Sequence, residues 1–179
     1  MGRRRLSAAS RNSRVSAARR ILLVGGLALA LWGMGHGLWY AVLAEHQALN
    51  AMGSSLTAAF TGAAQRNAPH VNSSMQQYKE AKYVYDRQVD AHSHWIGLAM
   101  LLIVLAVCFD RLALSEKWKV LLAWGVLSGA VLFPLGVLLQ TFSHGPVPRA
   151  IAALGSALEI VSLLLIAIAF AHRPSSAYP

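Results

Sequence analysis

Four long apolar blocks constrain this chain more than any other feature of its sequence. They cover approximately residues 21–44, 95–109, 120–139 and 150–171. A helix needs about 20 apolar residues to cross a bilayer, and most of these blocks approach or exceed that length. The 179 residues are 56% hydrophobic and 13% charged, as is typical of a polytopic membrane protein. We therefore expect an all-α protein with a four-helix transmembrane bundle.

The second block is too short to cross a bilayer unless its helix begins near Asp90 and continues to about Leu114. The expected membrane helices are then 21–44, 90–114, 118–140 and 148–171. They leave a basic tail at 1–20, an outer segment at 45–89 and a second tail at 172–179. The outer segment is expected to be helical, with a short helix between Ser54 and Arg66.

A second helix is expected in the outer segment from Ser73 onward. Its apolar side chains recur at the spacing of one helix face, at Met75, Tyr78, Tyr85 and Val89. Ser73 or Ser74 can serve as its N-cap. We expect this helix to continue without a break into the second membrane helix and to project from the bilayer.

The charge distribution predicts an orientation. The net charge is +9, and seven arginines precede the first block with no acidic residue among them: Arg3, Arg4, Arg5, Arg11, Arg14, Arg19 and Arg20. Such a tail is typical of a cytoplasmic N-terminus, and four spans return the C-terminus to the same side. We expect a bacterial inner membrane protein whose tail binds anionic lipid. Nucleic-acid binding is not expected, because the chain has no folded basic module.

A cleaved signal peptide is the alternative explanation of the N-terminus, since Ala28-Leu29-Ala30 has the pattern of a cleavage site. The apolar run continues well past this site, which favours a retained helix. The single cysteine, Cys108, lies in an apolar block and excludes a disulfide framework or a cysteine-based metal site.

Histidines are concentrated on one side of the expected topology. Six of the seven fall in the outer half of the membrane or outside it: His36, His46, His70, His92, His94 and His144. This asymmetry predicts heme or metal ligation, or proton and quinone chemistry, at the outer face. Amphipathic rings also gather at membrane interfaces for purely structural reasons, which is the alternative explanation for several of them.

The sharpest hypothesis is a b-type heme between the first two membrane helices. His36 would supply one axial ligand and His94 or His92 the other, since helical bundles hold cofactors between facing helices. Gly33 and Gly37 flank His36 and would leave room for the macrocycle. Trp32, Trp39 and Tyr40 share the same side of the helix.

Helical geometry allows only one of His92 and His94 to face a given site, because positions i and i+2 differ by about 200°. Asp90, one turn before His94, could orient its ring, and Gly97, one turn after it, would leave space. These neighbours favour His94. His92 instead continues the apolar stripe of the outer helix.

Two further sites remain open. Copper could bind His92, His94 and another outer histidine, and an extended His-x-His would favour it. Glu159 is the only acid within the hydrocarbon part of any block. It could handle protons or bind a quinone, or it could be a protonated carboxyl with a purely structural role. No catalytic triad, phosphate-binding loop or H-E-x-x-H motif is present, so the sequence does not indicate a hydrolase.

The run D-A-H-S-H-W-I-G-L-A-M, preceded by G-M-G-H-G in the first helix, resembles small bacterial inner-membrane proteins in which His-x-His opens the second of four helices. More distantly it resembles the four-helix units of respiratory b-type cytochromes and heme A synthase. This resemblance implies heme and a place beside a respiratory complex. Those bundles commonly carry a histidine on the last helix, where this chain has Glu159, so the resemblance does not extend to a second heme.

Three functions follow as expectations. The first is electron transfer by a b-type heme near the outer face, in exchange with quinone or a partner oxidoreductase. The second is a non-catalytic accessory or assembly subunit of a larger respiratory or membrane-enzyme complex. It would pack through its glycine faces against other membrane subunits or further copies of itself. The third is a copper-binding or proton-linked membrane protein.

Overall fold

The computed structural model describes residues 16–172, and within them four helices are long and apolar enough to cross a membrane. This confirms the expected all-α transmembrane bundle. The predictions made for the N-terminal tail before residue 16 and for residues 173–179 lie outside the described residues. The helices are α2 (Ala17–Trp39), η1 (Tyr40–Ala44), α3 (Glu45–Ala64), α4 (Ala68–Cys108), η2 (Phe109–Arg111), α5 (Glu116–Leu139) and α6 (Pro146–Ala171).

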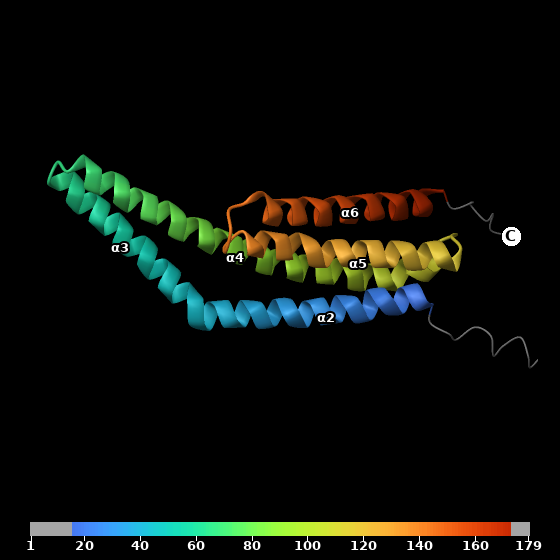
Figure 1. The fold of residues 1–179 in the computed structure, drawn as a ribbon. Coiled ribbons are helices and arrows are strands. Elements are labelled where there is room, and N and C mark those ends of the chain that lie inside the picture. The colour runs from blue at the N-terminus through green and yellow to red at the C-terminus, as the bar shows by residue number, and fades with distance from the viewer. Residues whose placement is uncertain (1–15, 173–179) are drawn as a thin grey trace, which may run out of the picture.

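The first membrane helix runs into the outer segment without a loop. The Ser16 side chain caps α2 by accepting a hydrogen bond from the Arg19 backbone N–H at 3.2 Å. After α2 the chain makes the π-helical turn η1 and continues directly as α3. Figure 1 shows the change of direction at this turn. The helix expected at 54–66 is therefore the second half of a longer one.

The second membrane helix is a single helix of 41 residues, which confirms that the outer helix and the second membrane helix are continuous. At about 1.5 Å per residue α4 is roughly 60 Å long, about twice the thickness of a hydrocarbon core. Its N-cap is Asn67, whose side chain accepts from the His70 N–H at 3.2 Å, and not Ser73 or Ser74. Ser74 instead lies within α4, beyond its first turn, and is buried. The helix ends at Cys108, short of the expected Leu114.

Helix α5 lies at the centre of the membrane part. It packs against α6 on one side and against α2 and α4 on the other, and α2 and α4 also pack against each other. Beyond one end of this bundle, α3 and the first part of α4 form a helical hairpin (Figure 1). We call this end the arm end, and the opposite end, at η2, the tail end.

Small side chains alternate with large ones along the inward face of α4. Its buried residues recur every three or four positions: Ala91, Trp95, Ala99, Leu102 and Ala106. The alanines let neighbouring backbones approach closely, as is usual between membrane helices, and the large side chains fill the space between them. A small residue also allows close backbone approach between α5 and α6, where a Cβ on Gly129 would lie 2.8 Å from the Glu159 backbone nitrogen.

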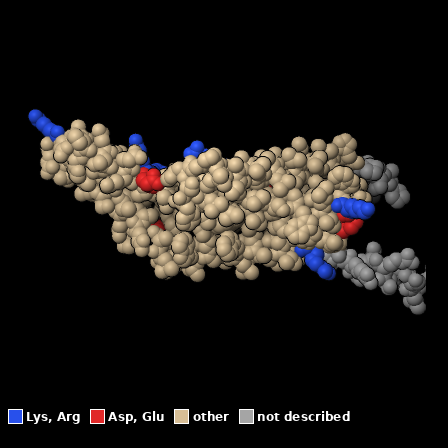
Figure 2. Space-filling model, in the orientation of Figure 1, with Lys and Arg blue, Asp and Glu red and all other residues tan. Residues whose placement is uncertain are grey.

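Charged side chains gather at the two ends of the molecule. On the face shown in Figure 2 the middle of the bundle carries none, while lysines, arginines and acids lie at both ends. At the tail end the Arg19 guanidinium lies 3.3 Å from a carboxylate oxygen of Asp110, which also accepts a hydrogen bond from Ser16. The uncharged band has the character expected of a surface in contact with lipid.

Candidate functional site

His36 lies on the face of α2 that the sequence predicts to be aromatic. Its ring centroid is 5.9 Å from that of Trp39 and 6.5 Å from that of Tyr40, both on the same side of the chain's first helix. Trp95 of α4 closes a further side, with its ring centroid 5.1 Å away. Trp32 turns to Trp95 at 6.0 Å, edge to face. The aromatic surroundings of His36 are confirmed.

Two hydrogen bonds fix imidazoles across the α2–α4 interface. The Nε2 atom of His36 lies 2.9 Å from Oε1 of Gln88, and the Nδ1 atom of His92 lies 2.9 Å from the carbonyl oxygen of Gly33. The ring centroids of His36 and His92 are 6.5 Å apart and their planes are 28° from parallel. We call His36, Tyr40, Gln88 and His92 the His36 cluster.

These contacts also determine the tautomer of each neutral ring. A carbonyl oxygen only accepts, so Nδ1 of His92 donates to Gly33 and its Nε2 keeps a lone pair. With the Gln88 amide oriented as in the structure, Nε2 of His36 donates and its Nδ1 keeps a lone pair. This Nδ1 is buried and has no hydrogen-bond partner in the structure.

A second unpaired polar atom belongs to Tyr40, whose ring stacks with that of His36. The hydroxyl of Tyr40 also has no partner, although the residue is only 7% exposed. Tyr40 is the first residue of the π-helical turn η1, and such turns occur frequently at functional sites. Buried polar groups are nearly always paired, so two unpaired atoms on neighbouring rings next to a π-helix make this a candidate place for a polar group from another molecule.

Gln88 belongs to this site although its sequence position was not predicted to do so. Gln88 lies one helical turn before His92, so it belongs to the same face of α4. This spacing could have identified it once His92, and not His94, was known to face α2. Tyr85, on the same helix, adds a ring whose centroid is 6.2 Å from that of Tyr40.

Gly33 and Gly37 allow close helix packing, as expected, but the space beside them is filled. A Cβ on Gly37 would collide with the imidazole of His92, and one on Gly33 would lie 3.0 Å from Cδ1 of Ile96. The rings of His36 and His92 keep nitrogens of the kind that ligate heme iron. A macrocycle between them does not fit this arrangement, because the glycine gap already holds His92. Heme binding stays a prediction that requires the two helices to separate.

His94 lies on a different side of α4 from His92. Its ring packs on Phe133 of α5, with centroids 4.7 Å apart. Asp90, expected to orient it, pairs with Arg87 at 3.3 Å, and a Cβ on Gly97 would meet open space. The expectation that only one of the two histidines faces α2 agrees with this geometry, and the structure places His92 there, beside His36.

The other outer histidines do not gather into a metal site. His46 bonds Asn50 at 3.0 Å, His70 packs beside Gly62, and His144 lies 3.3 Å from a carboxylate oxygen of Glu80. Among residues 16–172 no group of three or more histidine, cysteine or acidic side chains is placed to hold a metal ion. The segment that contains His-x-His is helical, so the extended geometry that favoured copper does not occur, and copper binding stays a prediction.

Glu159 is buried in the interface between α5 and α6. It is 5% exposed, it packs over Gly129, and its Oε1 atom has no hydrogen-bond partner in the structure. A charged carboxylate without a partner is costly in the hydrocarbon region, which favours the protonated form. The structure does not join Glu159 to the His36 cluster.

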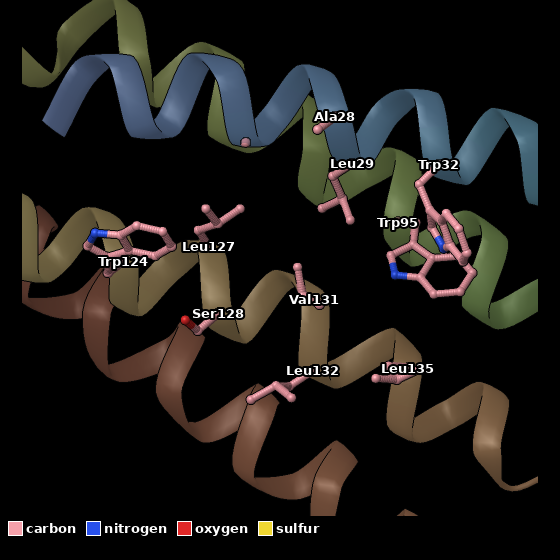
Figure 3. Close-up of a pocket in the computed structure, with 11 residues that line it drawn as sticks. Ala28, Leu29, Trp32, Trp95, Trp124, Leu127, Ser128, Val131, Leu132 and Leu135 are labelled. Atoms are coloured by element: carbon pink, nitrogen blue, oxygen red, sulfur yellow. The ribbon is translucent and has the colours of Figure 1, made fainter. Parts of the chain in front are cut away.

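Two cavities open beside the cluster. The larger, of about 650 Å³, lies between α2 and α5 and is almost entirely apolar; its lining includes Leu29, Trp32, Trp95, Trp124 and Leu127 (Figure 3). The smaller, of about 380 Å³, is lined by Leu31, Trp32, Gly35, His36 and Trp39. Both volumes are in the range of small-molecule sites. Trp32 borders both cavities.

Comparison of the chain with protein-family models, curated protein sequences and solved structures found no match. The resemblance to b-type cytochromes and heme A synthase therefore stays an expectation from the quoted motifs.

Proposed function

We propose that this protein is a non-catalytic accessory subunit of a larger membrane complex and that it contacts its partner through the helical hairpin at the arm end. We call residues 46–78, which comprise most of α3 and the first part of α4, the arm. We further propose that the arm faces the outside of a bacterial inner membrane, because the arginine-rich tail is typical of a cytoplasmic N-terminus.

The observation that carries this proposal is the lack of charge on the arm. Arg66, at its tip, is the only lysine, arginine or acid between residues 46 and 78. Ordinary soluble surfaces are much richer in charge, whereas the centres of protein interfaces are poor in it and enriched in aromatic residues. Phe60 of α3 is 74% exposed and Leu49 is 47% exposed. A partner subunit that covers α3 would bury both.

A pull-down with a matched pair of substitutions tests this proposal. Full-length tagged protein, expressed at its native level, is purified in mild detergent and its companions are quantified by mass spectrometry. Phe60→Lys should remove a companion that is present in stoichiometric amount, because it places a charge in the interface. Gln65→Lys, beside Arg66 at the exposed tip, should retain it. The absence of a stoichiometric companion, or equal retention by both variants, would contradict the proposal.

Electron transfer by a b-type heme is a separate proposal. The free nitrogen on each of the His36 and His92 rings supports it, and it requires α2 and α4 to separate so that the macrocycle can enter. Bound heme would supply a one-electron carrier. Protein expressed with ample heme should then show a reduced b-type absorption spectrum that is lost in His36→Ala and His92→Ala and retained in His94→Ala. A colourless, folded protein would exclude this proposal, and loss only in His94→Ala would return the ligand to the histidine favoured by the sequence.

A further inference from the structure

We infer that the smaller cavity binds the neutral headgroup of a quinone or quinol and that the larger cavity holds its isoprenoid tail. This inference concerns the membrane part of the molecule and does not depend on what the arm binds. It stands on the shape of the two cavities, on the unpaired polar atoms of His36 and Tyr40, and on the absence of charged residues from the lining of either cavity.

The headgroup cavity has the form of an aromatic clamp. Trp32 and Trp39 lie two turns apart on the same side of α2, and their side chains are 61% and 49% exposed. Gly35 lies between them, and a Cβ there would meet no atom within 4 Å. A flat ring can therefore lie over Gly35 and contact the two indoles, which favour offset or edge-to-face arrangements with other aromatic rings.

The polar anchors are His36, which lines this cavity, and Tyr40, whose ring stacks with that of His36. The Nδ1 atom of His36 and the hydroxyl of Tyr40 are buried without partners. A quinone oxygen can accept a hydrogen bond from the phenol, and a quinol hydroxyl can donate to the imidazole lone pair. The Trp39 ring lies beside both residues, with its centroid 5.9 Å from that of His36 and 6.4 Å from that of Tyr40. The inference therefore requires the half-exposed Trp39 side chain to move outward before the headgroup reaches the two covered atoms. Binding then supplies the hydrogen bonds that the free protein lacks.

The larger cavity provides a site for a long apolar tail. It shares Trp32 with the headgroup cavity and continues along α2 to Ala28 and Gly25, away from the arm end. Its wall on α5 includes Leu127, Val131 and Leu135, and Figure 3 shows Leu127 and Val131 pointing toward α2. A branched hydrocarbon chain can make many close van der Waals contacts with this apolar lining. Each contact is weak, but together they favour binding of the chain.

Neither cavity is lined by a lysine, arginine or acid, which disfavours phospholipid headgroups as the preferred ligand. No lysine, arginine or acid occurs between residues 21 and 44, so His36 lies about 13 Å along the helix from the first charge, Glu45. A phosphate held at this depth would have no cationic partner on α2, and burying it would be costly. A headgroup with uncharged oxygens meets no such penalty.

Equilibrium binding to the full-length protein in nanodiscs tests the inference. The probe is a benzoquinone with a decyl tail, and empty nanodiscs correct for partition into lipid. Tyr40→Phe should weaken binding about five- to tenfold, the worth of one hydrogen bond, while Tyr78→Phe in the arm should not. Gly35→Leu should weaken binding more than tenfold, because its side chain fills the clamp in a place where the fold has open space.

A matched hydrocarbon shows whether the oxygens are recognised. Decylbenzene has the same tail and ring without the carbonyl groups, and it should bind at least tenfold more weakly than the quinone. Equal binding of the two compounds, unchanged affinity in Tyr40→Phe and Gly35→Leu, or no saturable binding above empty nanodiscs would each overturn the inference.

Discussion

The Nε2 atom of His36 lies 2.9 Å from Oε1 of Gln88, although 52 residues separate them in the chain. This contact joins the first and second membrane helices where both approach the arm end. It is also the bond that leaves Nδ1 of His36 without a partner. The orientation of the His36 ring therefore depends on Gln88, an uncharged side chain that does not titrate.

Replacing Gln88 should destabilise the protein. In Gln88→Leu the donor on His36 loses its acceptor, and a buried polar group left unpaired costs about 1–3 kcal/mol. Thermal unfolding in detergent should show a lower midpoint for this variant. Gln76→Leu, at an exposed position on the same helix, is the control and should change little. Equal midpoints for Gln88→Leu and the wild type would show that the contact does not contribute.

Adding a methyl group at Gly37 should separate α2 from α4. The new Cβ would collide with the ring of His92, and such overpacking typically costs about 1–3 kcal/mol. Gly35→Ala is a matched control two residues away, because its Cβ meets open space. We expect the unfolding midpoint to fall in Gly37→Ala and to stay level or rise in Gly35→Ala. A similar fall of the unfolding midpoint in both variants would show that the effect does not come from the contact with His92.

Replacing Gly129 by alanine should weaken the packing of α6 against α5. A Cβ at this position would lie 2.8 Å from the backbone nitrogen and 2.9 Å from the Cα atom of Glu159, and backbone atoms cannot move aside as a flexible side chain can. Gly129→Ala should increase proteolysis of the turn between α5 and α6 and lower stability by about 1–3 kcal/mol. Gly97→Ala, in open space, should do neither.

The ion pair at the tail end should contribute modestly and depend on salt. The Arg19 and Asp110 side chains are 40% and 39% exposed, and pairs of this kind are worth up to about 1 kcal/mol. A double-mutant cycle with Arg19→Gln and Asp110→Asn should give a coupling that decreases at high ionic strength, because exposed charges are screened. A coupling well above 1 kcal/mol, or one unaffected by salt, would contradict this estimate.

Local spacing was sufficient to predict much of the site. His36, Trp39 and Tyr40 belong to one helix, so their positions at i, i+3 and i+4 already place them on one side. The spacing of Tyr85 and Val89 predicted a helix that continues into the membrane, and α4 confirms it. The predicted start of that helix, at Ser73 or Ser74, was wrong. The helix is capped by Asn67, more than one turn before Ser73. Asparagine is as good an N-cap as serine, and the apolar stripe does not distinguish between them.

The choice between His92 and His94 shows where local information ends. Their angular separation on α4 follows from the helix itself, but which of the two meets α2 depends on how α4 is rotated about its axis. Asp90 and Gly97 favoured His94, yet the first pairs with Arg87 and the second meets open space. Packing sets the rotation, since Trp95 and the alanines on its face are buried between α2 and α5.

The sequence by itself determined that four apolar helices form a membrane bundle, because a chain with so few charges in such long runs must satisfy its backbone within helices when it is surrounded by lipid. It also determined that an aromatic face surrounds His36. Only the tertiary structure decided that His92 and Gln88 meet that face, that the glycine gap is filled by an imidazole, and that α2 continues through a π-helical turn into the arm. These features depend on contacts between distant segments, where the fit of side chains across two helices, and not the preference of either helix alone, selects the arrangement.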